Sequence, residues 1–533
     1  MRLYIPTFLF FVVQFAWGTD PYPRNYNIDI QHYRFTIEVN DSTNIIKGSS
    51  EITILFRNSL DQFELDLVAK RDDGTGMTVH SVTSEGKPVN FYHTGERLLI
   101  KPGKVSESDE LTFLINYSGQ PKDGLIISKN KFGDRTMFGD NWPNRAHHWL
   151  PCIDHPYDKA TCEFIVSAPS HYQTIANGVL IEKKELPEGR TWVHWKEDKA
   201  IPTKVMVIGV ARFAISTAGM VDGVPIETWV YPQNKEAGFT DYKIAAQITD
   251  YFTDELGAFP FKKLANVQST TRYGGMENAS NIFYFENSVT GKNERENLIA
   301  HEVAHQWFGD SASELDWYHV WLSEGFATYF TSLYLEHAYG KQRLMQHMKE
   351  NRNEVLTYFR SNPSPVIDTT YADITLVLNT NSYEKGGWFL HMLRKKVGDE
   401  TFWKGINSYY QQYQYSNAMT DDFRKVMEEV SNQDLKEFFD QWLTRPGHPV
   451  LSAKWTYDAR KKMLNISVEQ IQKDVYDTAL EIEIETTNGE KEVISLRLDN
   501  RTVSLAKPLA KKPQKLTLDP NVWLLFEGEI GPK

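Results

Sequence analysis

Apolar and polar residues alternate with a period of two through most of the first 230 positions. The alternation is clear in residues 33–39 and 52–56, and turn-forming Asp and Gly residues separate such stretches, as at positions 71–74. This pattern is typical of strands with one buried face. It predicts a β-rich N-terminal domain over residues 19–232.

The period changes near residue 233. Residues 241–256 and the segments from 294 to 442 carry apolar positions at helical spacing, and Thr420-Asp421-Asp422 before Phe423 is a helix-capping signal. Arg445-Pro446-Gly447 breaks this pattern. Alternation then returns, as in residues 480–485. We therefore expect a mostly helical domain over 233–445 and a small β-sandwich over 446–533.

The predicted fold class is multidomain α+β, because 533 residues exceed a single ordinary core. Lys and Arg number 58 against 70 Asp and Glu, for a formal charge of −12. A phosphate-binding surface normally needs a basic stripe, so this balance argues against a nucleic-acid partner.

The first residues have the pattern of a secretory signal. Met1-Arg2 precedes an apolar run over residues 3–17, and Ala16-Trp17-Gly18 is a small-x-small cleavage pattern. We expect a signal peptide at 1–18, export to a periplasmic or extracellular space, and no stable membrane insertion after cleavage. The alternative is a membrane anchor through residues 3–17, although the run is shorter than the ~20 residues of a typical span.

The chain has two cysteines, Cys152 and Cys162. At this size a disulfide scaffold is excluded. One bridge or two half-buried thiols both fit the sequence.

The strongest chemical signal is His301-Glu302-Val303-Ala304-His305. Positions four apart on an α-helix lie on one face, so both imidazoles can share one tetrahedral ion. Catalytic zinc takes three protein ligands and keeps one position open. Glu302 can then act as a base without binding the metal.

A second predicted helix supplies the missing ligand. Glu324 lies in an apolar tract over residues 321–329, where an unpaired carboxylate would be costly to bury. A metal contact would offset that cost. We therefore expect one Zn²⁺ per chain, held by His301, His305 and Glu324.

The segment Gly274-Gly275-Met276-Glu277-Asn278 lies upstream of these helices. Adjacent glycines permit close backbone approach to a ligand. Glu277 is a fixed negative charge suited to the α-ammonium of a peptide.

Together these motifs resemble the aminopeptidase-N family of gluzincin zinc peptidases, which also contains leukotriene-A hydrolase. The resemblance extends to Ser382-Tyr383-Glu384-Lys385-Gly386 and to Pro151-Cys152-Ile153-Asp154-His155-Pro156, and it covers roughly residues 30 to 450. It implies a saddle-shaped β domain, a thermolysin-like catalytic domain and a β-sandwich. The chain would be a short form without the C-terminal helical domain of many relatives, which implies a more open cleft or one closed by another subunit.

The resemblance also implies the roles of the site residues. The function would be hydrolysis of the N-terminal peptide bond of peptides with a free amine, with a zinc-bound water as nucleophile and Glu302 as general base. Tyr383 would stabilise the oxyanion. Glu277 would bind the amine, while Gly274, Gly275, Met276 and Asn278 would line the substrate.

The sequence departs from the family at three further positions. Ser323 replaces the Asn that often precedes the zinc Glu, which should tune the site and not abolish it. His155 replaces a common Glu, and the sequence assigns it no role. Counting back from Pro151 at the family spacing places Trp142 where an amine-binding Glu or Gln is common.

The replacement by Trp142 predicts a first-residue pocket that favours neutral apolar or aromatic side chains. Packing of Trp142 inside the N-terminal domain, away from substrate, is the alternative. Two alternative functions remain. One is a thermolysin-type endopeptidase, which would not explain the motif at residues 274–278, and the other is a binding module without activity. Epoxide hydrolysis stays open as a side activity.

Overall fold

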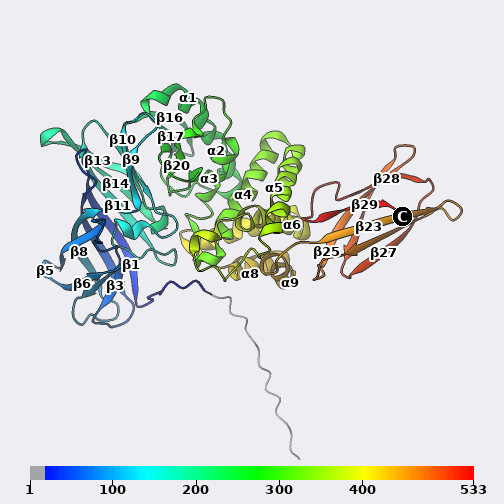
Figure 1. Cartoon of the computed structure of the whole chain (residues 1–533), viewed down its shortest axis with the longest axis horizontal. Helices are drawn as coiled ribbons and strands as arrows, with labels where there is room; N and C mark the ends of the chain where they lie inside the picture. The colour runs from blue at the N-terminus through cyan, green and yellow to red at the C-terminus, as the bar shows by residue number, and fades with distance from the viewer. Residues whose placement is uncertain (1–18) are drawn as a thin grey trace, which may run out of the picture.

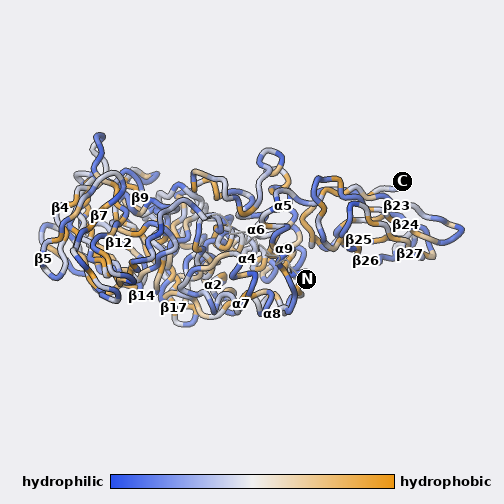
Figure 2. The backbone as a smooth tube through the Cα atoms, turned by 90° about the horizontal axis from the view of Figure 1, so that it is seen from below, coloured by the Kyte–Doolittle hydropathy of each residue, from blue (hydrophilic) through white to orange (hydrophobic). Residues whose placement is uncertain are grey.

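The computed structural model describes residues 19–533, and the predicted signal peptide lies outside the described residues. Three domains follow one another along the long axis of the molecule (Figure 1). Strands form the first and last domains and helices dominate the middle one, which confirms the predicted fold class. In Figure 2, hydrophobic and hydrophilic stretches alternate along the tube in both β domains, as expected for strands with one buried face.

The N-terminal domain is built on an eight-stranded sheet in the order β13-β14-β11-β1-β2-β8-β4-β5. In its centre β1 pairs antiparallel with β2 and parallel with β11. The predicted inward residues Tyr33, Phe35 and Ile37 are at most 1% exposed. The strands of this domain are β1 (Ile28–Glu38), β2 (Ile46–Phe56), β3 (Phe63–Asp66), β4 (Gly76–Ser84), β5 (Lys87–Pro88), β6 (Asn90–Thr94), β7 (Arg97–Lys101), β8 (Glu110–Gln120), β9 (Gly124–Lys129), β10 (Arg135–Asp140), β11 (Lys159–Pro169), β12 (Gln173–Ala176), β13 (Val179–Leu186), β14 (Arg190–Pro202) and β15 (Ile208–Ala211).

Two strands assigned by their pattern to the first domain belong to the next one. β16 (Ala214–Val221) pairs with β17 (Val224–Val230), and β17 pairs in parallel with β18 (Leu264–Ser269). These strands share a sheet with β20 (Asn281–Phe285) and β19 (Gly275–Met276). The boundary therefore lies between β15 and β16, and not at residue 232. A period of two identifies a strand but not the sheet that it joins.

The catalytic domain places its helices beside this five-stranded sheet (Figure 1). Its helices and remaining short strands are α1 (Lys235–Tyr242), α2 (Ile244–Leu256), α3 (Glu296–His305), β21 (Ala312–Glu314), α4 (Trp321–Tyr339), α5 (Lys341–Ser361), η8 (Asn381–Lys385), α6 (Gly386–Val397), α7 (Asp399–Tyr413), β22 (Ser416–Ala418), α8 (Thr420–Ser431) and α9 (Lys436–Phe439). α4 is the central helix, because α3, α5, α6 and η8 all pack against it. Fifteen of its consecutive residues, 321–335, are buried.

The C-terminal domain has two sheets, ordered β27-β24-β23-β29 and β26-β25-β28. Their strands are antiparallel, except that the edge strand β29 pairs in parallel with β23. Its strands are β23 (Val450–Asp458), β24 (Met463–Gln470), β25 (Thr478–Thr486), β26 (Lys491–Leu498), β27 (Thr502–Pro508), β28 (Pro513–Leu518) and β29 (Glu527–Pro532). The predicted inward positions Leu480, Ile482 and Ile484 are at most 1% exposed.

The segment before β1 ties the first two domains together through Asp20. Its carboxylate accepts a hydrogen bond from the Trp317 amide at 3.0 Å and lies 2.9 Å from His155 Nε2. Arg24 bridges Asp20 and Asp316 at 2.8 Å each. His155, to which the sequence assigned no role, is therefore part of the contact between the domains.

Cys152 and Cys162 are both buried free thiols, which excludes the alternative of a bridge between them. Within residues 19–533, no helix combines the length and hydropathy required to cross a bilayer.

A close contact between glycines fixes η8 against α4. A Cβ on Gly325 would lie 2.9 Å from the Gly386 Cα and 3.1 Å from the Ser382 carbonyl oxygen. Because both partners are backbone, neither can rotate away. Two small residues therefore allow the Tyr383 segment to approach the helix that carries Glu324.

Gly325→Ala should lower the free energy of unfolding by ~1–3 kcal/mol, the usual cost of overpacking. The measurement is urea unfolding of metal-free protein, so that metal binding does not contribute. Gly531→Ala is the control, since a Cβ there meets nothing within 4 Å. Equal stability of the two variants would show that the contact can relax.

Candidate active site

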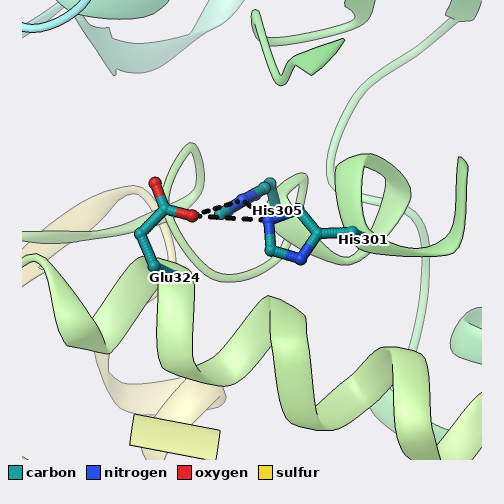
Figure 3. Close-up of side chains that lie close together, drawn as sticks. All are labelled: His301, His305 and Glu324. Carbon is teal, nitrogen blue, oxygen red and sulfur yellow. Dashed lines mark hydrogen bonds and ion pairs between the residues drawn. The ribbon is translucent and has the colours of Figure 1, made fainter. Parts of the chain in front are cut away.

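Three side chains from two helices converge in the catalytic domain. His301 and His305 lie one turn apart on α3, and Glu324 lies in the first turn of α4 (Figure 3). Their ligand atoms are close: the two Nε2 atoms are 3.0 Å apart, and Glu324 Oε2 lies 3.4 Å from His301 Nε2 and 3.2 Å from His305 Nε2. The structure therefore brings together the three residues that the sequence assigned to one metal ion.

The His305 ring is oriented by groups behind it. Its Nδ1 lies 3.1 Å from the Phe308 carbonyl oxygen and 3.0 Å from Ser323 Oγ. A carbonyl can only accept, so Nδ1 carries the proton in the neutral ring and Nε2 keeps its lone pair for a metal. Ser323 thus contacts a metal ligand from behind, in line with the tuning role that the sequence suggested.

The charges around these two imidazoles indicate whether the site suits a metal ion. Burial lowers the pKa of His305, but Glu324, Glu277 and Glu302 outweigh it and raise that pKa to about 10. The buried Glu324 Oε2 atom faces the Nε2 atoms of both imidazoles, at 3.4 and 3.2 Å. Two imidazoles, a carboxylate and an excess of buried negative charge suit a dication, and the N/O donor set is that of catalytic zinc.

Glu302 lies beside the cluster but is not one of its three ligands. Burial, followed by the charges of Glu277 and Glu324, raises its pKa well above the ordinary value, although His305 opposes this. A Cβ on Gly275 would lie 2.2 Å from Glu302 Oε1. Glycine at 275 is therefore required for the loop to approach the carboxylate this closely.

Gln306 holds the loop at residues 274–280 against α3, and no motif in the sequence identified it. Its Nε2 donates to the Glu277 carbonyl at 2.6 Å and to Asp310 at 2.9 Å, while its Oε1 accepts from the Ser280 amide at 2.8 Å. The only signal in the sequence is its place directly after His305. It follows the last residue of α3, and its side chain is fully buried.

Tyr383 on η8 faces the same cluster. Its ring stacks on His301 with centroids 5.7 Å apart and an angle of 10° between the planes. Burial and the neighbouring carboxylates raise the pKa of its phenol well above the ordinary value. The hydroxyl therefore keeps its proton and can donate a hydrogen bond.

A cavity of about 420 Å³ opens onto these residues. It is lined by Gly274, Gly275, Met276 and Glu277, by the metal cluster with Glu302 and Tyr383, and by Trp142. Asn278 was expected at the substrate, but it is fully buried and does not line the cavity. Its place behind the loop follows from the turn at 278–281, where its carbonyl accepts from the Asn281 amide at 2.8 Å.

Trp142 combines both placements that the sequence left open. Its side chain is packed edge-on against Tyr273 and Trp317, at centroid distances of 6.3 and 5.4 Å, and is 2% exposed. It nevertheless lines the cavity, together with Tyr273 and Glu277.

A buried His-His-Glu cluster beside a separate carboxylate and a phenol has the composition of a metal-dependent hydrolase site. Residues 29–205 match the peptidase M1 N-terminal domain, and residues 240–442 match the peptidase family M1 domain. The chain belongs to peptidase family M1, and its resemblance to the aminopeptidase-N family is confirmed.

Several characterised proteins are similar to this chain. It is 31% identical over 334 residues to the glutamyl aminopeptidase of Sus scrofa, an alignment that covers 59% of this chain and 35% of that protein. It is 26% identical over 471 residues to probable aminopeptidase 2 of Sulfurisphaera tokodaii, covering 84% and 58%. The chain thus spans less than two thirds of these relatives.

Solved structures share the fold. The M1 zinc metallopeptidase of Deinococcus radiodurans superposes with a TM-score of 0.68 at 23% identity, over 79% of this chain and 95% of that one. Aminopeptidase A of Legionella pneumophila gives a TM-score of 0.80 at 16% identity, over 96% and 61%.

Glu324→Ala should lower zinc content, because two imidazoles alone make an incomplete catalytic site. The measurement is zinc per chain after dialysis against a weak chelator. Glu336→Ala, near the other end of α4, is the control and should keep its zinc. Stoichiometric zinc of unchanged affinity in Glu324→Ala would remove Glu324 from the ligand set.

Proposed function

We propose that the protein is a zinc-dependent aminopeptidase that hydrolyses the first peptide bond of peptides with a free N-terminus. The observation that carries this proposal is the Glu277 carboxylate. It lines the cavity, is 5% exposed, and its Oε1 has no hydrogen-bond partner. A buried carboxylate without a partner is costly, and a substrate ammonium would compensate it.

The distance from Glu277 to the metal cluster supports cleavage at the first residue. Ligand atoms of Glu277, Glu302 and His305 all lie within 4.8 Å of one another. An amine held by Glu277 therefore has room for a single residue before the scissile carbonyl reaches the cluster. The endopeptidase hypothesis does not explain the buried Glu277 carboxylate at this position.

Zinc held by His301, His305 and Glu324 would act as a Lewis acid and make water more acidic. Glu302 would take a proton from the attacking water at a carboxylate oxygen and later deliver it to the leaving amine, as the carbon–nitrogen bond breaks. Its raised pKa suits this exchange, because a carboxylate of low pKa is a poor base. The Tyr383 phenol would donate to the oxygen that becomes negatively charged.

The wild-type protein should cleave leucine p-nitroanilide and leave the N-acetylated compound intact, because acetylation removes the ammonium. Glu277→Gln should reduce kcat/KM for the free amine while zinc stays bound. The measurement is kcat/KM for both compounds together with zinc content. Equal cleavage of the two by wild type would favour the endopeptidase, and cleavage of neither would favour a binding module.

Glu302→Gln should keep zinc and lose turnover by ~10²–10⁴-fold, the usual effect of losing a general base. The substitution preserves volume and removes the proton acceptor. Parallel zinc analysis and steady-state kinetics make the measurement, with Glu294→Gln just before α3 as the control. Near-normal turnover in the zinc-loaded Glu302→Gln protein would assign the proton transfer elsewhere.

The first-residue pocket should favour neutral apolar side chains. Trp142, Tyr273 and Met276 line the cavity together with Glu277, and within the described residues no lysine or arginine lines it. Glutamyl aminopeptidases are among the relatives, but an acidic first residue would meet no cation here. Burial of an apolar side chain contributes about 1.5–3 kcal/mol, against ~0.5–1 for an exposed cation–π contact with a basic one.

Leucine and phenylalanine p-nitroanilides should therefore rank above the glutamate, lysine and arginine compounds in kcat/KM. Trp142→Ala should reduce the advantage of the aromatic compound most. Tyr92→Ala, at an exposed site in the N-terminal domain, is the control. A charged compound ranking first in wild type would overturn the preference, and an unchanged order in Trp142→Ala would remove Trp142 from the pocket.

A further inference from the structure

The lining of the active-site cavity carries more negative charge than the proposed reaction uses. Five glutamates line it, and within residues 19–533 no lysine or arginine does. Glu324 is assigned to the metal, Glu302 to the proton transfer and Glu277 to the substrate amine. Glu354 and Glu384 have no part in these steps.

The two unused carboxylates come from elements on one side of the metal cluster. Glu354 lies on α5 and Glu384 on η8, directly after Tyr383. η8 and α5 pack against each other and against α4, and Thr328 and Thr331 continue along α4 from Glu324 on the side that lines the cavity. A peptide with its amine on Glu277 and its carbonyl beside Tyr383 therefore continues towards Glu384 and Glu354.

The rest of this end of the cavity is polar and uncharged. It is lined by Thr328 and Thr331 of α4 and by His347 and Asn351 of α5. Burial lowers the pKa of His347 to about 4, so the ring is neutral at pH 7, and its Nδ1 lies 2.9 Å from Ser332 Oγ. Asn351 is 6% exposed, and its Nδ2 has no hydrogen-bond partner.

Glu354 is exposed and Glu384 is half-buried, and within residues 19–533 no lysine or arginine lines the cavity beside them. Burial and the adjacent Glu354 raise the pKa of Glu384 to about 7, which is the expected response to an uncompensated neighbour of like charge. A positive group between them would remove this repulsion. A second metal ion is not favoured, because among the described residues the groups spaced to hold a metal include neither glutamate.

We propose that Glu354 and Glu384 form the binding site for the side chain of the second substrate residue, and that they select lysine or arginine at that position. The amine or guanidinium enters between the carboxylates, while the methylene stem lies along Thr328 and Thr331. This inference rests on the proposed aminopeptidase function.

The test compares kcat/KM for Leu-Lys-Ala, Leu-Ala-Ala and Leu-Glu-Ala amides on the zinc-loaded full chain. Wild type should favour lysine over alanine by about fivefold, the upper range for one accessible ion pair, and disfavour glutamate. Glu354→Gln should lower the lysine-to-alanine ratio. Glu354→Lys should raise the glutamate-to-alanine ratio above one, a gain that loss of packing alone cannot produce.

Glu350→Gln is the matched control, because it removes the same charge one turn earlier on α5 and does not line the cavity. Its lysine-to-alanine ratio should equal that of wild type. The wild-type preference should also shrink in 1 M salt, where exposed charges are screened beyond ~3 Å.

Leucine p-nitroanilide separates failure of this inference from failure of the proposed function, since it has no second residue. Cleavage of that compound with equal rates on the three peptides would overturn the specificity site and leave the aminopeptidase. Cleavage of neither the anilide nor the peptides would overturn both. A lysine preference that persists unchanged in Glu354→Gln and Glu354→Lys would place the recognition elsewhere.

Discussion

The structure depends on one electrostatic constraint, the burial of several carboxylates around two imidazoles in a cavity that no lysine or arginine of residues 19–533 lines. Glu277, Glu302 and Glu324 are each at most 5% exposed. The nearest buried lysine, Lys204, is paired with Glu314 at 2.5 Å and acts on Glu277 only from a distance. Such a cluster is stable only when charge is supplied from outside or protons are taken up. A dication would supply part of that charge, and under the proposed function a substrate ammonium would supply more.

The scaffold that concentrates this charge is formed by close backbone contacts. Gly275 allows the loop at residues 274–280 to lie close to Glu302. The Gly325–Gly386 contact allows η8 to lie close to α4, the helix of Glu324. Gln306 then fixes the loop with two hydrogen bonds, one to the Glu277 carbonyl and one from the Ser280 amide. The Gly325–Gly386 contact joins two backbones, and the Gln306 side chain bonds to the backbone at Glu277 and Ser280, so the elements that carry the carboxylates are held close together. Preorganised charge of this kind is the main source of transition-state stabilisation in many enzymes.

The sequence predicted the parts of the site that lie close together along the chain. Helical spacing alone placed His301 and His305 on one face of α3, and the cost of burying Glu324 identified the third ligand. Tyr383 could be selected only through the family resemblance, because nothing in its surroundings along the chain distinguishes it from other aromatic residues. Gln306, Glu354 and the partners of His155 could not be predicted, since their roles arise from tertiary contacts. The misassigned β16 and β17 have the same cause, because sheet membership depends on pairing partners far away in the chain.

The placement of the charges gives the peptide a direction. The compensating groups of a substrate lie at fixed intervals along its backbone: an ammonium at one end, a carbonyl that becomes negative one residue later, and a side chain beyond it. The carboxylate of Glu277, the cluster with Tyr383, and Glu384 with Glu354 all line one cavity, and the proposed binding mode uses them in that order. A peptide bound in reverse would place its carboxylate against Glu277 and leave the other glutamates unpaired. Coulomb repulsion in a buried site makes that orientation costly, so the same uncompensated charge that requires a metal also sets which end of a peptide enters first.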